Sequence, residues 1–185
     1  MVTAPAGYGK TTLVSSWIEQ VHCPTAWISL DDGDNDIAVF LGYFVTAIGS
    51  IFPDFGKQIL TFSQAPALPP LSAIASYLLN ELNHIEQDFV LVLDDFHLLT
   101  NSDIHVVLND LLHSPLPHFH LTLISRYDLP QQLAKLRAQG KVRELRAADL
   151  RFSAAEVASF TEKALPTKPD AETIRILTEK QKAGR

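Results

Sequence analysis

A glycine-rich loop that ends in a lysine and two threonines constrains this chain more than any other feature. Residues 4–12 read Ala-Pro-Ala-Gly-Tyr-Gly-Lys-Thr-Thr, which fits the pattern G-x-x-x-x-G-K-S/T with the small residue Ala4 at the first position. A short strand is expected at residues 1–3 before the loop, and a helical pattern at residues 11–20 follows it. This is the strand, loop and helix order that the motif requires.

The residues of this loop suit the binding of a phosphate chain. Gly7 and Gly9 let the backbone curl around an anion with its N–H groups pointing inward, and the helix that follows directs its positive end at the same anion. Lys10 can reach the β- and γ-phosphates, and the hydroxyl of Thr11 is a ligand for Mg²⁺. We therefore predict a site for ATP or ADP with Mg²⁺, formed by Ala6, Gly7, Tyr8, Gly9, Lys10, Thr11 and Thr12.

Short apolar runs alternate with helical patterns over residues 1–150, which predicts an α/β fold with a parallel sheet flanked by helices. Strands are expected at 1–3, 26–30, 89–93, 120–124 and 142–145, and helices at 11–20, 36–50, 71–85, 104–113 and 130–139. Residues 53–70 are expected to be rich in loops. Trp17 and Trp27 lie in apolar periodic segments and are predicted to belong to the core.

The sequence after residue 150 has a different character. From Ser153 onward it indicates only helices, which begin with a capping box formed by Ser153 and Glu156. Pro166 and Pro169 separate two helical segments. We expect a P-loop nucleotide-binding domain at 1–150 and the beginning of a small helical domain at 151–185.

An acidic pair follows the most apolar strand of the chain. Residues 89–93 read Phe-Val-Leu-Val-Leu, and Asp94 and Asp95 come next. Carboxylates are costly to bury, but the carboxyl ends of parallel strands form the edge where ligands bind in open α/β sheets. We predict that Asp94 holds Mg²⁺ together with Thr11 and that Asp95 polarises the attacking water.

A serine and an arginine follow the next expected strand. Ser125 and Arg126 come after residues 120–124, so they should reach the same edge of the sheet as the phosphate loop. A guanidinium there can stabilise the charge on a γ-phosphate. Arg126 is thus a candidate catalytic or sensor residue, and an ordinary surface arginine is the alternative.

The composition limits the other functions. No apolar run reaches the roughly 20 residues that span a bilayer. The one cysteine, Cys23, cannot form an internal disulfide, which fits a cytoplasmic protein. Residues 1–125 carry two basic and thirteen acidic side chains, a poor surface for nucleic acid. The later residues are net basic, which indicates either a partner surface or a solvated helical face.

Two metal motifs fail on their spacing. The run from Asp32 to Asp36 resembles the opening of a calcium loop, but it lacks the required glycine and the closing glutamate, so it is better explained as a turn in which Asp36 or a neighbour caps a helix. His118 and His120 lack a third ligand at a suitable spacing. We interpret His97, His105 and His113 as surface or core residues.

Five segments in a fixed order resemble the ATPase module of MalT-like, LuxR-type transcriptional activators, which belong to the STAND class of P-loop ATPases. They are the phosphate loop with its flanks, Ala-Trp-Ile-Ser-Leu-Asp-Asp-Gly-Asp-Asn-Asp at 26–36, Leu-Val-Leu-Asp-Asp-Phe-His at 91–97, Ser-Arg-Tyr-Asp at 125–128, and Glu-Leu-Arg-Ala-Ala-Asp-Leu-Arg-Phe-Ser at 144–153. One departure is Ile124, where the family often has a hydroxyl residue.

The resemblance implies a switch in which ADP holds an inactive monomer, while ATP with an inducer allows self-association. It also implies slow hydrolysis, with Lys10 and Thr11 as the Walker A pair, Asp94 and Asp95 as the Walker B pair and Arg126 as the sensor arginine. The helix-turn-helix of such activators has no counterpart in these residues, so we expect no direct DNA binding by this chain.

Two other functions stay open. A stand-alone P-loop enzyme, such as a kinase or an ATP-driven motor, would show fast turnover. The chain could instead be a non-functional fragment of a split gene, or its start site could be misassigned, because only three residues precede Ala4 while a central strand spans about five or six.

Overall fold

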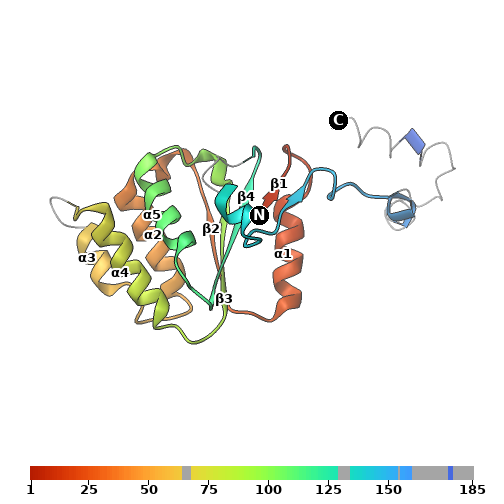
Figure 1. Cartoon of the computed structure of the whole chain (residues 1–185). Coiled ribbons are helices and arrows are strands. Elements are labelled where there is room, and N and C mark those ends of the chain that lie inside the picture. The colour runs from red at the N-terminus through yellow and green to blue at the C-terminus, as the bar shows by residue number, and fades with distance from the viewer. Residues whose placement is uncertain (64–67, 129–133, 154, 160–174, 177–185) are drawn as a thin grey trace.

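The chain forms an α/β fold around a five-stranded parallel sheet, which confirms the predicted fold class (Figure 1). The computed structural model describes residues 1–63, 68–128, 134–153, 155–159 and 175–176. The strand order is β2-β3-β4-β1-β5. The strands are β1 (Val2–Thr3), β2 (Thr25–Ser29), β3 (Phe89–Asp94), β4 (Phe119–Ser125) and β5 (Leu145–Arg146).

Helices cover both faces of this sheet. Figure 1 shows α1 on one side, whereas α2, α4 and α5 lie on the other side, with α3 outside them. The α-helices are α1 (Lys10–Val21), α2 (Ile37–Gly49), α3 (Lys57–Ser63), α4 (Leu71–Asn83), α5 (Ser102–His113) and α6 (Ala134–Ala138). Two short 3₁₀ turns are η1 (Asp32–Asn35) and η2 (Phe96–Leu98).

Strand β3 is the centre of the core. All six of its residues are buried, because Val90 and Val92 pack with α1 on one face while Phe89, Leu91 and Leu93 pack with the helices on the other. This is why its sequence is apolar throughout instead of alternating. The strand also includes Asp94, which the sequence had placed just beyond its end.

Several predicted elements need correction. Residues 53–70, expected as loop-rich, contain helix α3. The last strand lies at Leu145–Arg146 and not at 142–145. Trp17, predicted to be in the core, is 42% exposed. The helical pattern at 130–139 is described only from Ala134 to Ala138.

The turns and caps behave as predicted. Asp36 caps α2 by accepting hydrogen bonds from Ala38 and Val39 N–H groups, and the preceding residues form a turn. Ser153 and Glu156 form the predicted capping box. The two helical segments around Pro166 and Pro169 lie outside the described residues. Among the residues that are described, no helix is long and apolar enough to cross a bilayer.

Candidate nucleotide-binding site

The glycine-rich loop connects β1 to α1 with the backbone that its two glycines permit. Gly7 and Gly9 have φ angles of 83° and 70°, a region that side-chain-bearing residues rarely adopt. The space beside each glycine is open, so conformation and not crowding explains both residues. The N–H of Ala4 donates to the carbonyl of Ser125 (3.3 Å), which ties the loop to the end of β4.

Lys10 lies under this loop as a buried cation. Its side chain donates to the carbonyl of Pro5 (3.1 Å), and the residue is 8% exposed. Burial lowers the pKa of the ammonium, while the nearby charge of Asp95 raises it. An ammonium has three donors. The two that Pro5 does not use can serve a phosphate.

Thr11, in the first turn of α1, meets Asp94 at the end of β3, although β4 lies between β3 and β1 in the sheet. The hydroxyl of Thr11 donates to Oδ2 of Asp94 (2.9 Å), and Oδ1 of Asp94 accepts from the N–H of Asp95 (2.9 Å). Asp94 is 6% exposed. The sequence had assigned a magnesium ion to these two side chains, and the structure brings them together.

The donor set fits a magnesium ion. A hydroxyl and a carboxylate are hard oxygen ligands, and Mg²⁺ usually takes only one or two protein groups with phosphates and waters in the remaining positions. Within the described residues there is no group of three or more His, Cys, Asp or Glu side chains that would hold a metal by themselves. Thr11 and Asp94 therefore suit a metal that arrives with a nucleotide.

Asp95 lies at the same edge in an uncommon backbone conformation. Its φ of 53° is left-handed, which is rare for a residue other than glycine. Its Oδ1 is 3.7 Å from Nε of Arg126, so the structure brings these two predicted residues together. Both side chains are half-exposed and can be reached from solvent.

His97 is a site residue that the sequence interpretation missed. Its Nδ1 lies 3.7 Å from the same Oδ1 of Asp95, and its side chain is 8% exposed. Nδ1 is buried without a hydrogen-bond partner in the described structure. Burial lowers the pKa of His97, which favours a neutral ring. The available signal was its position two residues after Asp95, where the turn η2 directs it back to the carboxylate.

Polar contacts hold the segment around Arg126 in place. The hydroxyl of Ser125 donates to the carbonyl of Tyr127 (2.7 Å), and the ring of Tyr127 packs edge-on against His97 with centroids 5.6 Å apart. Asp128 pairs with Arg146 of β5 (3.5 Å).

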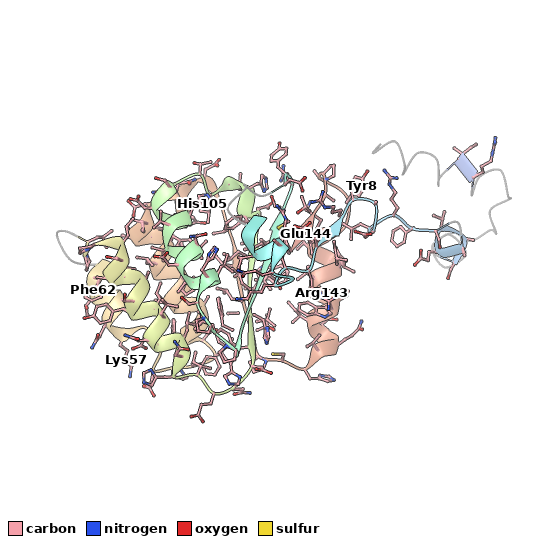
Figure 2. All side chains as sticks on the ribbon, in the orientation of Figure 1. Tyr8, Lys57, Phe62, His105, Arg143 and Glu144 are labelled. Carbon is pink, nitrogen blue, oxygen red and sulfur yellow. The ribbon has the colours of Figure 1, made fainter. Side chains whose placement is uncertain are left out.

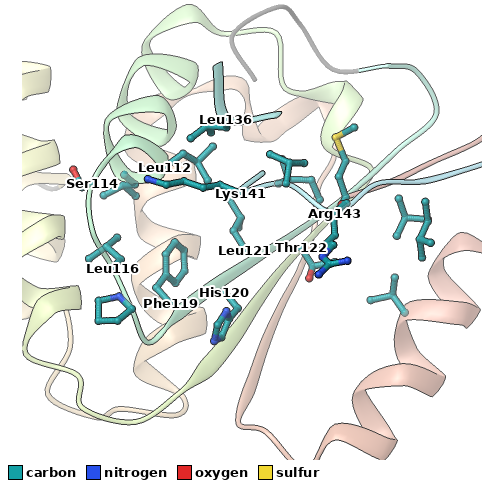
Figure 3. A pocket seen from close by; sticks show the side chains of 18 of the residues that line it. Leu112, Ser114, Leu116, Phe119, His120, Leu121, Thr122, Leu136, Lys141 and Arg143 are labelled. Atoms are coloured by element: carbon teal, nitrogen blue, oxygen red, sulfur yellow. The ribbon is translucent and has the colours of Figure 1, made fainter. Parts of the chain in front are cut away.

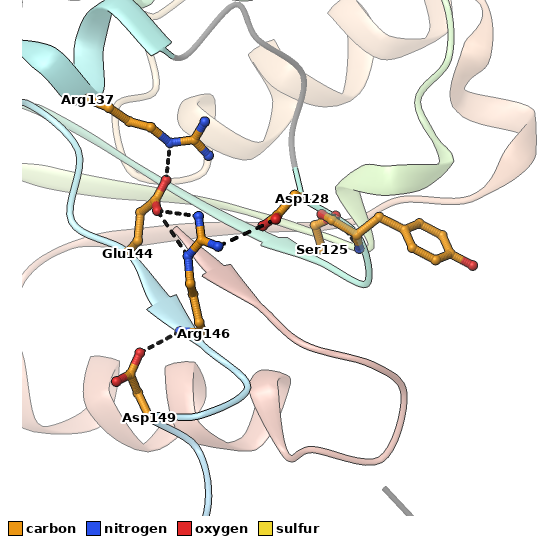
Figure 4. A network of polar contacts seen from close by, with 7 residues as sticks. Ser125, Asp128, Arg137, Glu144, Arg146 and Asp149 are labelled. Carbon is orange, nitrogen blue, oxygen red and sulfur yellow. Dashed lines mark hydrogen bonds and ion pairs between the residues drawn. The ribbon is translucent and has the colours of Figure 1, made fainter.

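A second set of ion pairs continues this network (Figure 4). Arg146 also bonds Glu144 (3.0 Å), which in turn pairs with Arg137 of α6. Hydrogen bonds from Arg137, and then from Arg146, lower the pKa of Glu144. The loop that carries Arg126 is thereby connected to both β5 and α6.

A sizeable cavity among the described residues lies elsewhere. It has a volume of about 870 Å³ and is lined by Met1 and Val2, by residues before and along β4, by parts of α1, α5 and α6, and by residues 141–143 and Leu145, but by none of residues 4–12 (Figure 3). Most residues of the phosphate loop are exposed to solvent, and Figure 2 shows Tyr8 at the loop above α1. A loop that wraps around a charged ligand needs no deep apolar cavity.

Comparison with one solved structure supports the same fold. The chain is similar to Cdc6p from Pyrobaculum aerophilum, with a TM-score of 0.52 and 14% identity over 87% of this chain and 41% of that protein. The Orc1 protein from Aeropyrum pernix, solved in complex with DNA, has a TM-score of 0.47 and 14% identity over 96% of this chain and 47% of that one. No protein-family model matches the sequence.

The likeness to the Pyrobaculum protein, at this low identity, concerns the fold alone. The fold is an α/β, P-loop NTPase-like fold with a five-stranded parallel sheet, which is the fold class that the sequence predicted. The chain spans less than half the length of either protein.

Proposed function

We propose that this chain is a nucleotide switch that binds ATP or ADP with Mg²⁺ through residues 6–12 and hydrolyses ATP slowly. The observation that carries the proposal is the hydrogen bond between Thr11 and Asp94 directly beneath the loop, beside the buried Lys10. A buried cation and a buried carboxylate are costly unless they are paired and hydrogen-bonded. Phosphates with a magnesium ion supply the complementary charges.

Each residue has a role that follows from its position. Lys10 holds the β- and γ-phosphates, and the backbone around Gly7 and Gly9 surrounds them. Thr11 and Asp94 would hold Mg²⁺, which neutralises phosphate charge when bound. Asp95, whose Oδ1 lies 3.7 Å from Nδ1 of His97, would orient the attacking water.

Arg126 gives the site a means to distinguish ATP from ADP. In this structure it faces Asp95 at 3.7 Å from an exposed position, so it can turn to a γ-phosphate without unfolding anything. Arg126 would exchange its carboxylate partner, Asp95, for a phosphate when ATP binds. This exchange would couple the nucleotide state to the loop after β4, which the ion pair between Asp128 and Arg146 holds.

The wider role is that of a regulatory module in a MalT-like, LuxR-type activator. This part of the proposal rests on the resemblance of the five sequence segments. Self-association in the ATP state belongs to it, while direct DNA binding by this chain does not.

The test of the switch compares ATP and ADP affinities in Arg126→Ala. We expect about tenfold weaker ATP binding, the equivalent of one lost charge-assisted hydrogen bond, and unchanged ADP binding. Isothermal titration calorimetry in the presence of Mg²⁺ measures both. Arg151→Ala is the control, because Arg151 is exposed and lies beyond β5. Equal losses for ATP and ADP in Arg126→Ala would remove the sensor role.

A further inference from the structure

The side chain of Asn35, the last residue of η1, joins the loop after β2 to the segment after β3. Its Nδ2 donates to the carbonyl of Leu98 (2.8 Å), and its Oδ1 accepts from the N–H groups of Thr100 (2.7 Å) and Asn101 (3.1 Å). Longer bonds run to the carbonyl of Asp32 (3.3 Å) and from the hydroxyl of Thr100 (3.2 Å). The amide thus uses its donor and its acceptor side at once, which neither an aspartate nor a hydrophobic residue can do.

A second asparagine makes the same contact in the reverse direction. The Nδ2 of Asn101 donates to the carbonyl of Asn35 (2.7 Å), while its Oδ1 caps α5 by accepting from the N–H of Asp103 (2.8 Å). Both asparagines are half-buried. The cap of α5 needs only the bond to Asp103, so it does not explain the bonds between the two asparagines. These bonds instead fix the segment after β3 to the loop after β2.

The loop after β2 holds both ends of the short turn that carries Asp95. On one side of Asp95, the carbonyl of Asp94 accepts from the N–H of Leu30 (3.1 Å). On the other side, the carbonyl of Leu98 accepts from Asn35. The turn itself is closed by the N–H of Leu98, which donates to the carbonyl of Asp95 (2.9 Å). Residues 30–35 therefore fix the turn at the residue before Asp95 and again three residues after it.

The backbone of Asp95 needs such support. Its φ of 53° costs energy in a residue other than glycine, and a conformation of this kind persists only where the surrounding structure fixes it. The direction of the carboxylate follows from this backbone, and its Oδ1 lies 3.7 Å from Nε of Arg126. If the anchor at Leu98 is lost, the turn can relax to an ordinary conformation and direct the carboxylate elsewhere.

We propose that Asn35 is a positioning residue, which holds the turn after β3 so that the carboxylate of Asp95 stays directed at the site of hydrolysis. This inference rests on the proposed function, because it takes Asp95 as the group that orients the attacking water. Asn35 acts through Asp95 and not on the nucleotide. Its loss should therefore reduce turnover, while the phosphate loop and Lys10 continue to bind Mg-ATP.

The first arm of the test measures amide hydrogen exchange in Asn35→Ala without nucleotide. We expect the N–H of Leu98 to exchange at least about tenfold faster than in the parent, because its bond to Asp95 loses the anchor on the adjoining carbonyl. The N–H of Leu91, at the centre of the sheet, reports any loss of overall stability. Asn83→Ala is the matched control, since Asn83 is exposed at the end of α4. An unchanged rate for Leu98 in Asn35→Ala would overturn the proposal.

The second arm measures ATP hydrolysis in a double-mutant cycle. Asn35→Ala should lower kcat by about 10- to 100-fold through the displaced carboxylate, with the Kd for Mg-ATP within about twofold of the parent value. In the Asp95→Asn chain the same substitution should change kcat by less than about twofold, because the group through which it acts is already lost. A merely structural role would lower kcat by the same factor in both chains, and that result would overturn the proposal.

Asn35→Asp separates the two sides of the amide. It keeps an oxygen for the N–H groups of Thr100 and Asn101 but has no donor for the carbonyl of Leu98. We expect kcat to fall about as far as in Asn35→Ala, and normal turnover would overturn the anchoring role of the bond to Leu98. Absence of ATP hydrolysis in the parent chain would refute the proposed function instead, while the exchange of Leu98 still decides whether Asn35 holds the turn.

Discussion

The two ends of the same parallel strands have opposite character. At the carboxyl ends of β1, β3 and β4 lie four of the five buried polar or charged side chains of the described residues, namely Thr3, Lys10, Asp94 and Ser125. At the amino ends of β1 and β4 lies an apolar cavity, and among the described residues Phe119–Leu123 pair with a strand on one side only. Polar groups that suit a charged ligand thus gather at the carboxyl ends of the strands, whereas the amino ends present loosely packed apolar surface.

The largest expected effect concerns ATP turnover at the carboxyl ends of the strands. Asp95→Asn should lower ATP hydrolysis by about 100- to 1,000-fold, because an amide cannot accept a proton from water as a carboxylate does. Nucleotide affinity should stay within about twofold, since Lys10 and the loop are unchanged. Phosphate release and a binding titration measure the two quantities. Asp32→Asn, at an exposed position, is the control, and normal hydrolysis in Asp95→Asn would exclude Asp95 from water activation.

Two leucine variants compare the stability that packing provides at the centre of the sheet and beside the cavity. Leu91 on β3 is fully buried, and Leu121 on β4 lines the cavity and is partly exposed. Leu91→Ala should lower the free energy of unfolding by about 3 kcal/mol, and Leu121→Ala by about 1 kcal/mol, because less surface leaves water at a residue beside a cavity. Urea unfolding measures both. Equal losses would mean that the amino end is as well packed as the centre of the sheet.

The smallest expected effect is a pH dependence at His97. Its pKa is lowered by burial from the ordinary value of 6.5, so the unfolded chain binds the proton more readily than the folded one. Stability should be complete above pH 6.5 and should fall as the pH decreases below it. The loss of stability between pH 7.5 and pH 5.5 should be smaller in His97→Gln, in which the other histidines still titrate. Parallel profiles of the two chains would show that His97 contributes nothing to this dependence.

Much of the site at the carboxyl ends of the strands could be predicted from local sequence. The glycines of the loop, the apolar run before Asp94 and the serine–arginine pair each have a local physical reason, and a parallel sheet brings the ends of its strands to one edge. The position of His97 two residues after Asp95 was a weak signal, because the direction of its side chain depends on the left-handed backbone of Asp95. No composition or spacing rule predicts that conformation at an aspartate.

The region at the amino ends of the strands was harder to predict, because the exposure of its residues depends on packing between distant segments. Trp17 has the sequence context of a core residue, but its exposure depends on what covers α1 beside the cavity.

Helix α3 is only seven residues long, too short to show a clear helical period. It is held by burial of Ile59 and by the bond from the N–H of Gly56 to Glu81, both of which depend on distant residues.

Nucleotide binding by Lys10→Ala tests the central claim most directly. The two lysines of the first 125 residues provide a matched pair, since Lys10 is buried under the loop while Lys57 is exposed far from it, paired with Asp54 (Figure 2). The account predicts that Lys10→Ala weakens Mg-ATP binding by about 100-fold, the equivalent of roughly 3 kcal/mol from the loss of charge-assisted phosphate contacts, and that Lys57→Ala leaves it unchanged. Equal affinities in the parent and in Lys10→Ala would contradict the assignment of the loop as a nucleotide site.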